Sequence, residues 1–350
     1  MKFDQIQSYE DVIKHLKKSK RKKHLLLGNG FSMAYDHKIF SYNALYEFIE
    51  NLDNELLSKL FNIINTKNFE LVMQQLDNFL ELAKVFSTDK ELVAKLENAS
   101  EELKTSLIDA IEKLHPEHVF EMPEEKSVKC FNFLSSFIDN EGKIFTTNYD
   151  LLMYWVLIRN QSQNAVDGFG REVENPDAYK TGDDFEWSDL YWGKNREKQS
   201  VFYVHGALPL FDTGVEILKE VYTEKDGNYL LQNIKKRMDN KDYPVFVTAG
   251  NGRQKLEHIM HNRYLTDCYE NLSKIEGSLI TFGFNFGEYD EHIIDAVNKA
   301  AKQGKKQPNK LWSIYIGVYS ESDFDYIQSI KDKFRCKVNV FDSKTASIWE

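Results

Sequence analysis

The chain has 350 residues, of which 42% are hydrophobic, and its formal net charge at pH 7 is −10. This length allows one large domain or two ordinary ones, and the hydrophobic content supports a buried core. The negative charge argues against a protein that clamps the nucleic-acid backbone as a whole, and no stretch approaches the roughly 18 apolar residues of a membrane span.

The number and spacing of the cysteines limit the metal sites and disulfide bonds that the chain can form. The chain has three cysteines, and none lies near another in the sequence. A four-cysteine zinc site within one chain is excluded, and a disulfide framework is not expected. The amino terminus lacks the apolar core of a secretory signal. These features predict a soluble protein of the cytoplasm, a reducing compartment.

The first predicted element is a helix over residues 4–20, which runs into a lysine-rich stretch at 14–23. A solvated helix end explains this stretch, because cations are favourable near the carboxyl end of a helix. A local nucleic-acid patch is the weaker alternative, and we do not expect direct nucleic-acid binding.

Short apolar runs then predict buried strands at residues 24–27, 143–147, 201–204, 244–248, 278–282, 311–318 and 336–341. Helical patterns lie between most of these runs. Strands that alternate with helices predict an α/β fold with a doubly wound, mostly parallel sheet.

Two segments interrupt this alternation. Residues 43–139 are expected to form a large helical insertion, which leaves 1–42 and 140–350 as the α/β domain. Its apolar residues recur at helical spacing and predict a packed core rather than a cofactor site. They are Phe69, Val72, Met73, Leu76, Phe79, Leu80 and Ala83, followed by Leu92, Leu96, Ala99, Leu103, Leu107, Ile111 and Leu114. Residues 159–200 show little periodicity and predict an irregular insertion or lid.

A glycine-containing turn follows the strand at 24–27 and consists of Gly28, Asn29, Gly30, Phe31 and Ser32. The glycines permit a tight turn and the close approach of a ligand, and amides at the start of the next helix can hold a pyrophosphate. An ordinary strand-to-helix turn explains the pattern equally well, because the third glycine of the dinucleotide fingerprint is missing.

The next loop contains Thr146, Thr147, Asn148, Tyr149 and Asp150. Open α/β sheets bind their ligands beyond the carboxyl ends of the strands, where this loop is expected to lie. Asn148 offers a hydrogen-bond donor and an acceptor, and Asp150 offers a carboxylate. Taken alone, Asp150 is better explained as a helix cap.

His205 follows the strand at 201–204, where an imidazole can take a proton near neutral pH. A structural histidine is the simpler alternative at such a position. The histidine pairs His258 and His261, and His115 and His118, lack a visible third ligand. We therefore expect no metal site.

The last loop carries Gly283, Asn285 and Asp290 after the strand at 278–282. It repeats the combination of a glycine with an amide side chain, and Asp290 can cap a helix over 291–301. An ordinary strand-to-helix turn explains this loop as well.

The order of these loops resembles that of the sirtuin-like fold, and in particular an uncharacterised branch of the bacterial sirtuin-like proteins that lack the zinc module of the deacylases. The similarity spans about residues 24–300. The shared segments are Leu26–Ser32, Phe40–Tyr42, Phe69–Glu70, Val166–Gly170, Tyr203–Leu208, Lys255 and Tyr264–Leu265.

This resemblance implies a Rossmann-type domain that binds NAD as its substrate without a metal. It implies that Gly28, Gly30 and Ser32 cradle the pyrophosphate, that Asn148 and Asp150 hold the nicotinamide ribose and a water, and that His205 removes a proton. Many zinc-free members cleave NAD as effectors of anti-phage defence, in homo-oligomers or with a partner protein. The four zinc cysteines and the Asp-Phe-Arg segment of the deacylases are absent, so deacylation is not expected.

We therefore expect an NAD hydrolase that breaks the bond between nicotinamide and ribose. The cationic pyridinium leaves as a neutral molecule, so the site has to hold the ribose, stabilise developing positive charge and place a water. A sensor that binds NAD or ADP-ribose without turnover remains the alternative. The choices between NAD and NADP, and between hydrolysis and cyclisation, remain open.

Overall fold

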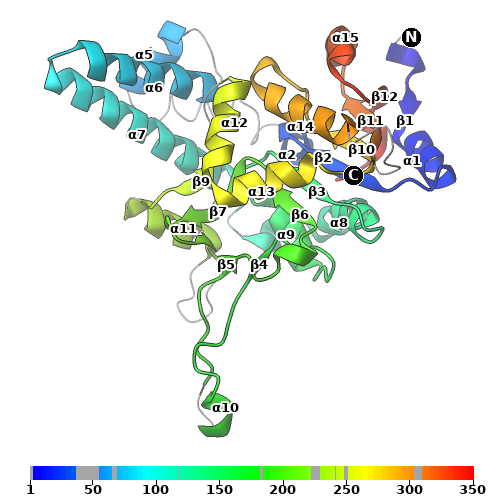
Figure 1. Ribbon diagram of the computed structural model, residues 1–350, viewed down its shortest axis with the longest axis horizontal. Coiled ribbons are helices and arrows are strands. Elements are labelled where there is room, and N and C mark those ends of the chain that lie inside the picture. The colour runs from blue at the N-terminus through cyan, green and yellow to red at the C-terminus, as the bar shows by residue number, and fades with distance from the viewer. Residues whose placement is uncertain are drawn as a thin grey trace.

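The computed structural model describes residues 3–36, 55–64, 69–116, 118–181, 184–221, 229–240, 242–247, 251–302 and 310–350. It shows an α/β fold built on a seven-stranded sheet with the strand order β1-β12-β11-β10-β2-β3-β6 (Figure 1). Every strand pair in this sheet is parallel. The prediction of an α/β fold with a mostly parallel sheet is confirmed at this level.

The strands of the large sheet are β1 (Gln7–Ser8), β2 (Lys23–Leu27), β3 (Ile144–Thr146), β6 (Val201–Tyr203), β10 (Gly277–Phe282), β11 (Leu311–Val318) and β12 (Lys337–Asp342). The helices around it are α1 (Tyr9–Lys18), α2 (Asn29–Tyr35), α8 (Glu124–Ile138), α9 (Leu152–Arg159), α12 (Gly252–His261), α13 (Arg263–Leu272), α14 (Glu291–Lys302) and α15 (Glu321–Ile330).

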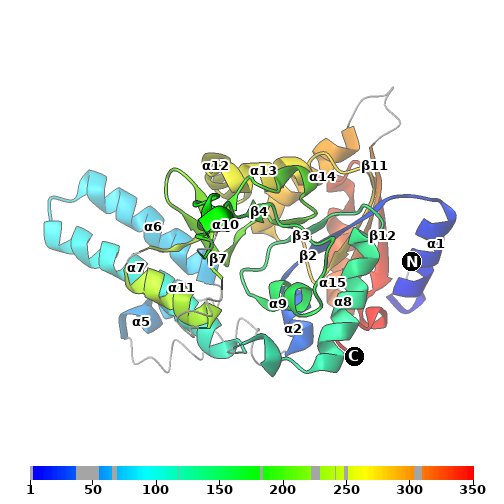
Figure 2. The same ribbon diagram turned by 90° about the horizontal axis from the view of Figure 1, so that it is seen from below.

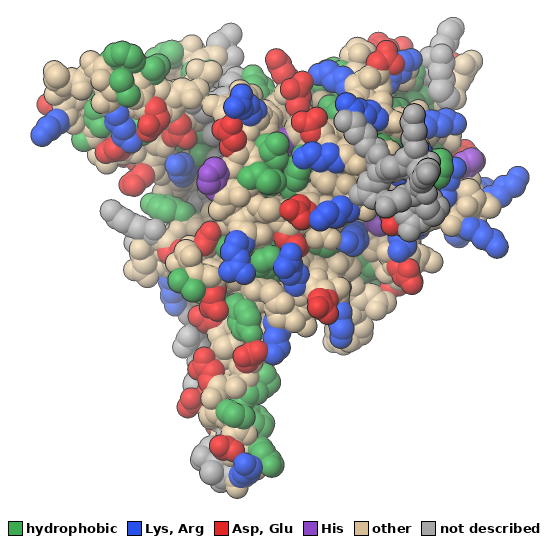
Figure 3. Space-filling view, viewed as in Figure 1, with side chains coloured by type: hydrophobic (Ala, Val, Ile, Leu, Met, Phe, Trp, Pro, Cys, Tyr) green, Lys and Arg blue, Asp and Glu red, His purple; other side chains and the backbone are tan. Residues whose placement is uncertain are grey.

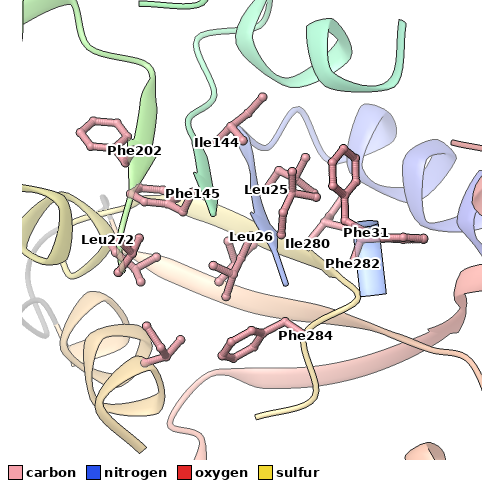
Figure 4. Packing of buried hydrophobic residues seen from close by; sticks show 14 of the residues in the cluster. Leu25, Leu26, Phe31, Ile144, Phe145, Phe202, Leu272, Ile280, Phe282 and Phe284 are labelled. Atoms are coloured by element: carbon pink, nitrogen blue, oxygen red, sulfur yellow. The ribbon is translucent and has the colours of Figure 1, made fainter. Parts of the chain in front are cut away.

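Helices cover both faces of the large sheet, with α12–α14 on one side and α1, α8 and α9 on the other (Figure 2). The central strands are therefore apolar on both faces, as buried parallel strands are. Leu25, Leu26 and Leu27 in β2 are fully buried. They lie in one hydrophobic cluster with Phe145 and Phe202 of the neighbouring strands (Figure 4). This shared core holds the central strands together, so that their carboxyl ends lie at one edge of the sheet.

The amino-terminal helix is shorter than the prediction of residues 4–20. A 3₁₀ turn (Phe3–Gln5) and the short strand β1 come first, and α1 starts at Tyr9. Ser8 and Asp11 form a capping box that fixes this start, since each side chain satisfies a backbone amide of the other. The prediction missed β1 because a two-residue edge strand leaves no periodicity.

A second, antiparallel sheet was also missed. Its strand order is β4-β5-β8-β7-β9. The strands are β4 (Phe169–Gly170), β5 (Tyr191–Trp192), β7 (Gly206–Asp212), β8 (Ile217–Lys219) and β9 (Pro244–Phe246). The run at 244–248 was expected in the parallel alternation, but β9 pairs antiparallel with β7. The segment 159–200 is therefore not wholly irregular, because it supplies β4 and β5.

A narrow arm extends from the second sheet and ends at α10 (Ala178–Thr181), at the bottom of Figure 3. Its two sides are joined by an isolated bridge between Val173 and Trp187. The arm exposes Tyr179, Phe185 and Trp187. The helix α11 (Leu230–Asp239) packs against Leu208 and Phe211 of β7 in the second sheet.

The described part of residues 43–139 is mainly helical, in α5 (Glu55–Ile64), α6 (Phe69–Phe86), α7 (Lys90–Leu114) and α8. The first three share a separate small core, whereas α8 belongs to the main core through side chains such as Phe133 and Phe137. Most predicted stripe positions that the structure describes are buried, but Phe79 is 52% exposed and Leu92 is 36% exposed. Phe40–Tyr42 and the side chains of Phe69, Glu70, Leu107, Ile111 and Leu114 lie outside the described residues. None of the described helices is long and apolar enough to cross a membrane.

Candidate functional site

The four loops singled out in the sequence follow four adjacent strands. The strand order contains β10-β2-β3-β6, and these strands are parallel, so their carboxyl ends meet at one edge of the sheet. The chain runs from β2 through β3 to β6 on one side, while β10 lies on the other side of β2. The sheet order therefore reverses between β2 and β10. Doubly wound sheets bind ligands at such a switch point.

Ser32 connects the first two loops. Asn148 Nδ2 donates a hydrogen bond to Ser32 Oγ at 2.9 Å, and Ser32 Oγ donates to Asp150 Oδ2 at 2.5 Å. Ser32 is fully buried and Asn148 is 9% exposed. The backbone amide of Asn148 donates to Thr146 Oγ1, which holds the bend of the loop. Three of the predicted site residues thus form one hydrogen-bonded chain.

Asp150 serves two purposes through its two oxygens. Oδ1 accepts the amide of Leu152, the first residue of α9, at 3.0 Å, while Oδ2 accepts the hydroxyl of Ser32. Asp150 therefore satisfies the first amide of α9 from the position before the N-cap residue, Leu151, and its carboxylate is also part of the site. Burial raises the pKa of Asp150, and the hydrogen bonds from Ser32 and Leu152 offset part of that rise, because they stabilise the charged form.

The glycine turn packs directly on the loop after β10. A Cβ on Gly28 would lie 2.5 Å from the Gly283 carbonyl oxygen, and one on Gly30 would lie 2.6 Å from Gly283 Cα. The amide of Gly30 donates to the Gly283 carbonyl at 2.9 Å, and the amide of Gly28 donates to the Phe282 carbonyl. Close backbone packing thus requires these glycines, and it uses two amides that were expected to face a pyrophosphate.

His205 lies two positions after the end of β6, and its segment runs beside the Asn148 loop because neighbouring strands lie about 4.8 Å apart. Its Nε2 lies 2.8 Å from His292 Nε2, and the rings stack with centroids 5.0 Å apart. Burial holds the pKa of His205 well below its usual range, and His292 and Lys255 lower it further. The expectation that His205 titrates near neutral pH is therefore wrong, because 3% exposure disfavours the charged ring.

Asp290 lies beside this histidine pair, and its Oδ1 accepts a hydrogen bond from Lys255 Nζ at 3.1 Å. Ligand atoms of His205, Asp290 and His292 all lie within 4.8 Å of one another. Asn285, in contrast, is exposed. No hydrogen bond joins it to the other predicted site residues in the described part of the chain.

Several residues at this edge were not recognised in the sequence. His292 is 1% exposed and was passed over, although it follows Asp290 by two positions. Phe286 adopts a left-handed backbone with φ 54° and is 1% exposed, a strained combination typical of functional loops. Trp349 Nε1 donates to the Phe31 carbonyl at 2.9 Å and so fastens the carboxyl terminus to α2. Such contacts join distant segments and leave no local signal.

His115 connects the helical segment to the site. It follows α7, and its Nε2 accepts the amide of Leu151 at 3.0 Å, directly after Asp150. Burial lowers its pKa to about 4, so the ring is neutral at pH 7 and can accept this hydrogen bond. The position of the Asp150 loop is thereby linked to the end of α7.

The arrangement combines a carboxylate, an amide and an imidazole at one edge of the sheet. A carboxylate can stabilise positive charge, an amide can orient a hydroxyl or a water, and a neutral imidazole can accept a proton. The Ser32 hydroxyl hydrogen-bonds both the Asp150 carboxylate and the Asn148 amide and so fixes their relative position.

Comparison with curated proteins finds no match for this chain. A family model described as a domain of unknown function, DUF4917, matches residues 25–349. This range begins inside β2 and covers the later strands of the large sheet, the second sheet and all of the loops described above. The chain belongs to the DUF4917 family.

Proposed function

We propose that this protein hydrolyses NAD at the bond between nicotinamide and ribose and releases nicotinamide and ADP-ribose. The observation that carries the proposal is the chain Asn148–Ser32–Asp150, which joins the first two loops at the point where the order of the sheet reverses. The resemblance of the motif order to zinc-free sirtuin-like proteins supports the choice of NAD. In a cell this activity depletes NAD, which suits an effector of anti-phage defence.

The proposed reaction needs little acid catalysis. The carbon–nitrogen bond breaks with its electron pair moving onto the pyridinium nitrogen, so nicotinamide leaves neutral. The ribose then carries positive charge, as in glycoside cleavage. Asp150 stabilises that charge, Asn148 orients a ribose hydroxyl or the attacking water, and His205 takes the proton that the water loses.

The lowered pKa of His205 is compatible with this role. A base has to be unprotonated before it reacts, and burial keeps the imidazole neutral at pH 7. Its Nε2 is engaged with His292. His292 therefore holds the His205 ring in one orientation, and one of the two Nε2 atoms has to donate the proton of their contact.

One observation favours a second candidate function, the sensing of NAD without turnover. The His205 ring is 3% exposed and is already paired with His292. A binding site can keep this histidine pair shielded from water at all times, whereas a hydrolase has to let the attacking water reach His205.

Purified protein with saturating NAD distinguishes the two candidates. The hydrolase predicts time-dependent nicotinamide release that His205→Ala abolishes and the exposed, matched change His261→Ala preserves. Saturable calorimetric binding of NAD with no nicotinamide over hours would replace hydrolysis with sensing. Equal turnover by wild type and His205→Ala would remove His205 from the mechanism.

A further inference from the structure

His205, Asp290 and His292 form a compact group of three ligand-type side chains. The two Nε2 atoms lie 2.8 Å apart, and the three residues each offer one ligand atom within 4.8 Å of the other two. The histidines come from segments 87 residues apart, at the end of β6 and the start of α14. The fold therefore converges these side chains from two directions.

Their chemistry is that of an open transition-metal site. Two imidazole nitrogens with one carboxylate bind zinc in many proteins, and a fourth position then remains for water or a substrate. Zinc–nitrogen bonds of about 2.0 Å place two tetrahedral ligands about 3.3 Å apart, about 0.5 Å more than the 2.8 Å between the two Nε2 atoms.

The surroundings of the group also fit a ligand set. Both rings are buried, with His205 3% and His292 1% exposed. His292 Nδ1 is buried without a hydrogen-bond partner among the described residues. In the present contact one Nε2 atom carries a proton and the other accepts it. A cation bound between the rings would replace that proton and would be held by the lone pairs of both Nε2 atoms.

Lys255 places a positive charge beside the Asp290 carboxylate. Its Nζ donates to Asp290 Oδ1, and its side chain is 1% exposed. The ammonium already neutralises the carboxylate and repels a second cation, so it weakens metal binding without blocking Asp290 Oδ2. Lys255 and a metal ion are therefore expected to compete for the same carboxylate.

We propose that His205, Asp290 and His292 bind one divalent transition-metal ion of the zinc class, and that this ion inhibits the protein. The inhibition rests on the proposed function, because a metal bound to His205 would prevent the ring from taking up the proton of the attacking water. The binding itself does not rest on that function.

Metal binding is measured on the full chain after chelator treatment, by titration with Co(II) and Zn(II). The wild type is expected to bind one ion and to give the strong visible absorption of tetrahedral Co(II). His292→Ala and Asp290→Asn are expected to weaken binding by about 100-fold, and His261→Ala to leave it unchanged. Lys255→Met is expected to tighten binding. Wild type that binds no more tightly than His292→Ala, or that gives only the octahedral Co(II) spectrum, would overturn the proposal.

Nicotinamide release in the same samples separates this inference from the proposed function. Release that zinc suppresses in wild type, and suppresses less in Asp290→Asn, supports both. A tight 1:1 metal complex in a protein that never releases nicotinamide keeps the metal site and removes the hydrolase. Release by a protein that binds no metal keeps the hydrolase and removes the metal site.

Discussion

Asn148 Nδ2 donates a hydrogen bond to Ser32 Oγ over 2.9 Å and joins two loops that lie 116 residues apart in the chain. The contact places an amide from the loop after β3 against a hydroxyl from the first turn of α2. Because Ser32 passes the hydrogen bond on to Asp150, the three side chains are expected to act as one unit.

Removal of the Asn148 amide is expected to reduce nicotinamide release by about 100-fold to 1,000-fold, the usual cost of a lost oriented donor. Asn148→Ala leaves Ser32 bonded to Asp150, so the fold should persist. The matched control is Asn140→Ala, at an exposed asparagine after α8. Circular dichroism verifies the fold, and turnover within threefold of wild type would contradict the role of Asn148.

Ser32→Ala is expected to shift the acid limb of the pH–rate profile upward. Burial already raises the pKa of Asp150, and the Ser32 hydroxyl lowers it in part. Without that hydroxyl the carboxyl pKa rises further, so activity is lost at a higher pH as the solution is acidified. The measurement is kcat against pH for both proteins. Coincident acid limbs would show that the ionisation of Asp150 does not control the rate.

Gly30→Ala is expected to destabilise the protein by about 1–3 kcal/mol. The added Cβ would meet Gly283 Cα at 2.6 Å, and backbone cannot move aside as a flexible side chain can. Gly287→Ala is the control, because its Cβ would meet Asn285 Oδ1 at 3.5 Å and Asp290 Oδ2 at 3.9 Å, which are ordinary contact distances. Urea denaturation measures both, and equal midpoints would show that the turn does not require glycine at position 30.

Acid is expected to weaken the fold through His24. Its Nδ1 accepts the amide of Lys143, and its Nε2 donates to the Glu276 carbonyl. Burial lowers its pKa from 6.5 to about 3. Between these values the unfolded chain holds a proton that the native chain lacks. The free energy of unfolding therefore decreases as the pH is lowered, by up to about 1.4 kcal/mol per pH unit.

Urea denaturation between pH 7 and pH 5 measures this effect. His24→Gln should be less stable than wild type at pH 7 and should lose less stability on acidification. A variant with the same pH slope as wild type would show that His24 does not carry the effect.

The sequence predicted much of the large sheet because its central strands are largely apolar and buried. Leu25–Leu27 and Ile280–Phe282 are short apolar runs bounded by glycine, and both became adjacent central strands. The second sheet escaped prediction because β4 and β5 have two residues each and their pairing is not local. Periodicity carries no information about such short strands.

The site could be predicted in part for a similar reason. Ser32, Asn148 and Asp150 were visible because they lie in the segments that follow two apolar strands, and the parallel pairing of β2 and β3 brings these segments together. The contact of His205 with His292 was not visible, because it joins residues 87 positions apart and depends on where the fold places the start of α14. The pKa of His205 also depends on burial, which its position at a strand end does not reveal.

The most direct test of the account is chromatography of NAD after incubation with the metal-free full chain and with Asn148→Ala. The account predicts stoichiometric nicotinamide and ADP-ribose from the wild type and intact NAD from the variant. Intact NAD in the wild-type reaction, under conditions where calorimetry shows NAD bound, would contradict hydrolysis as the function of this site.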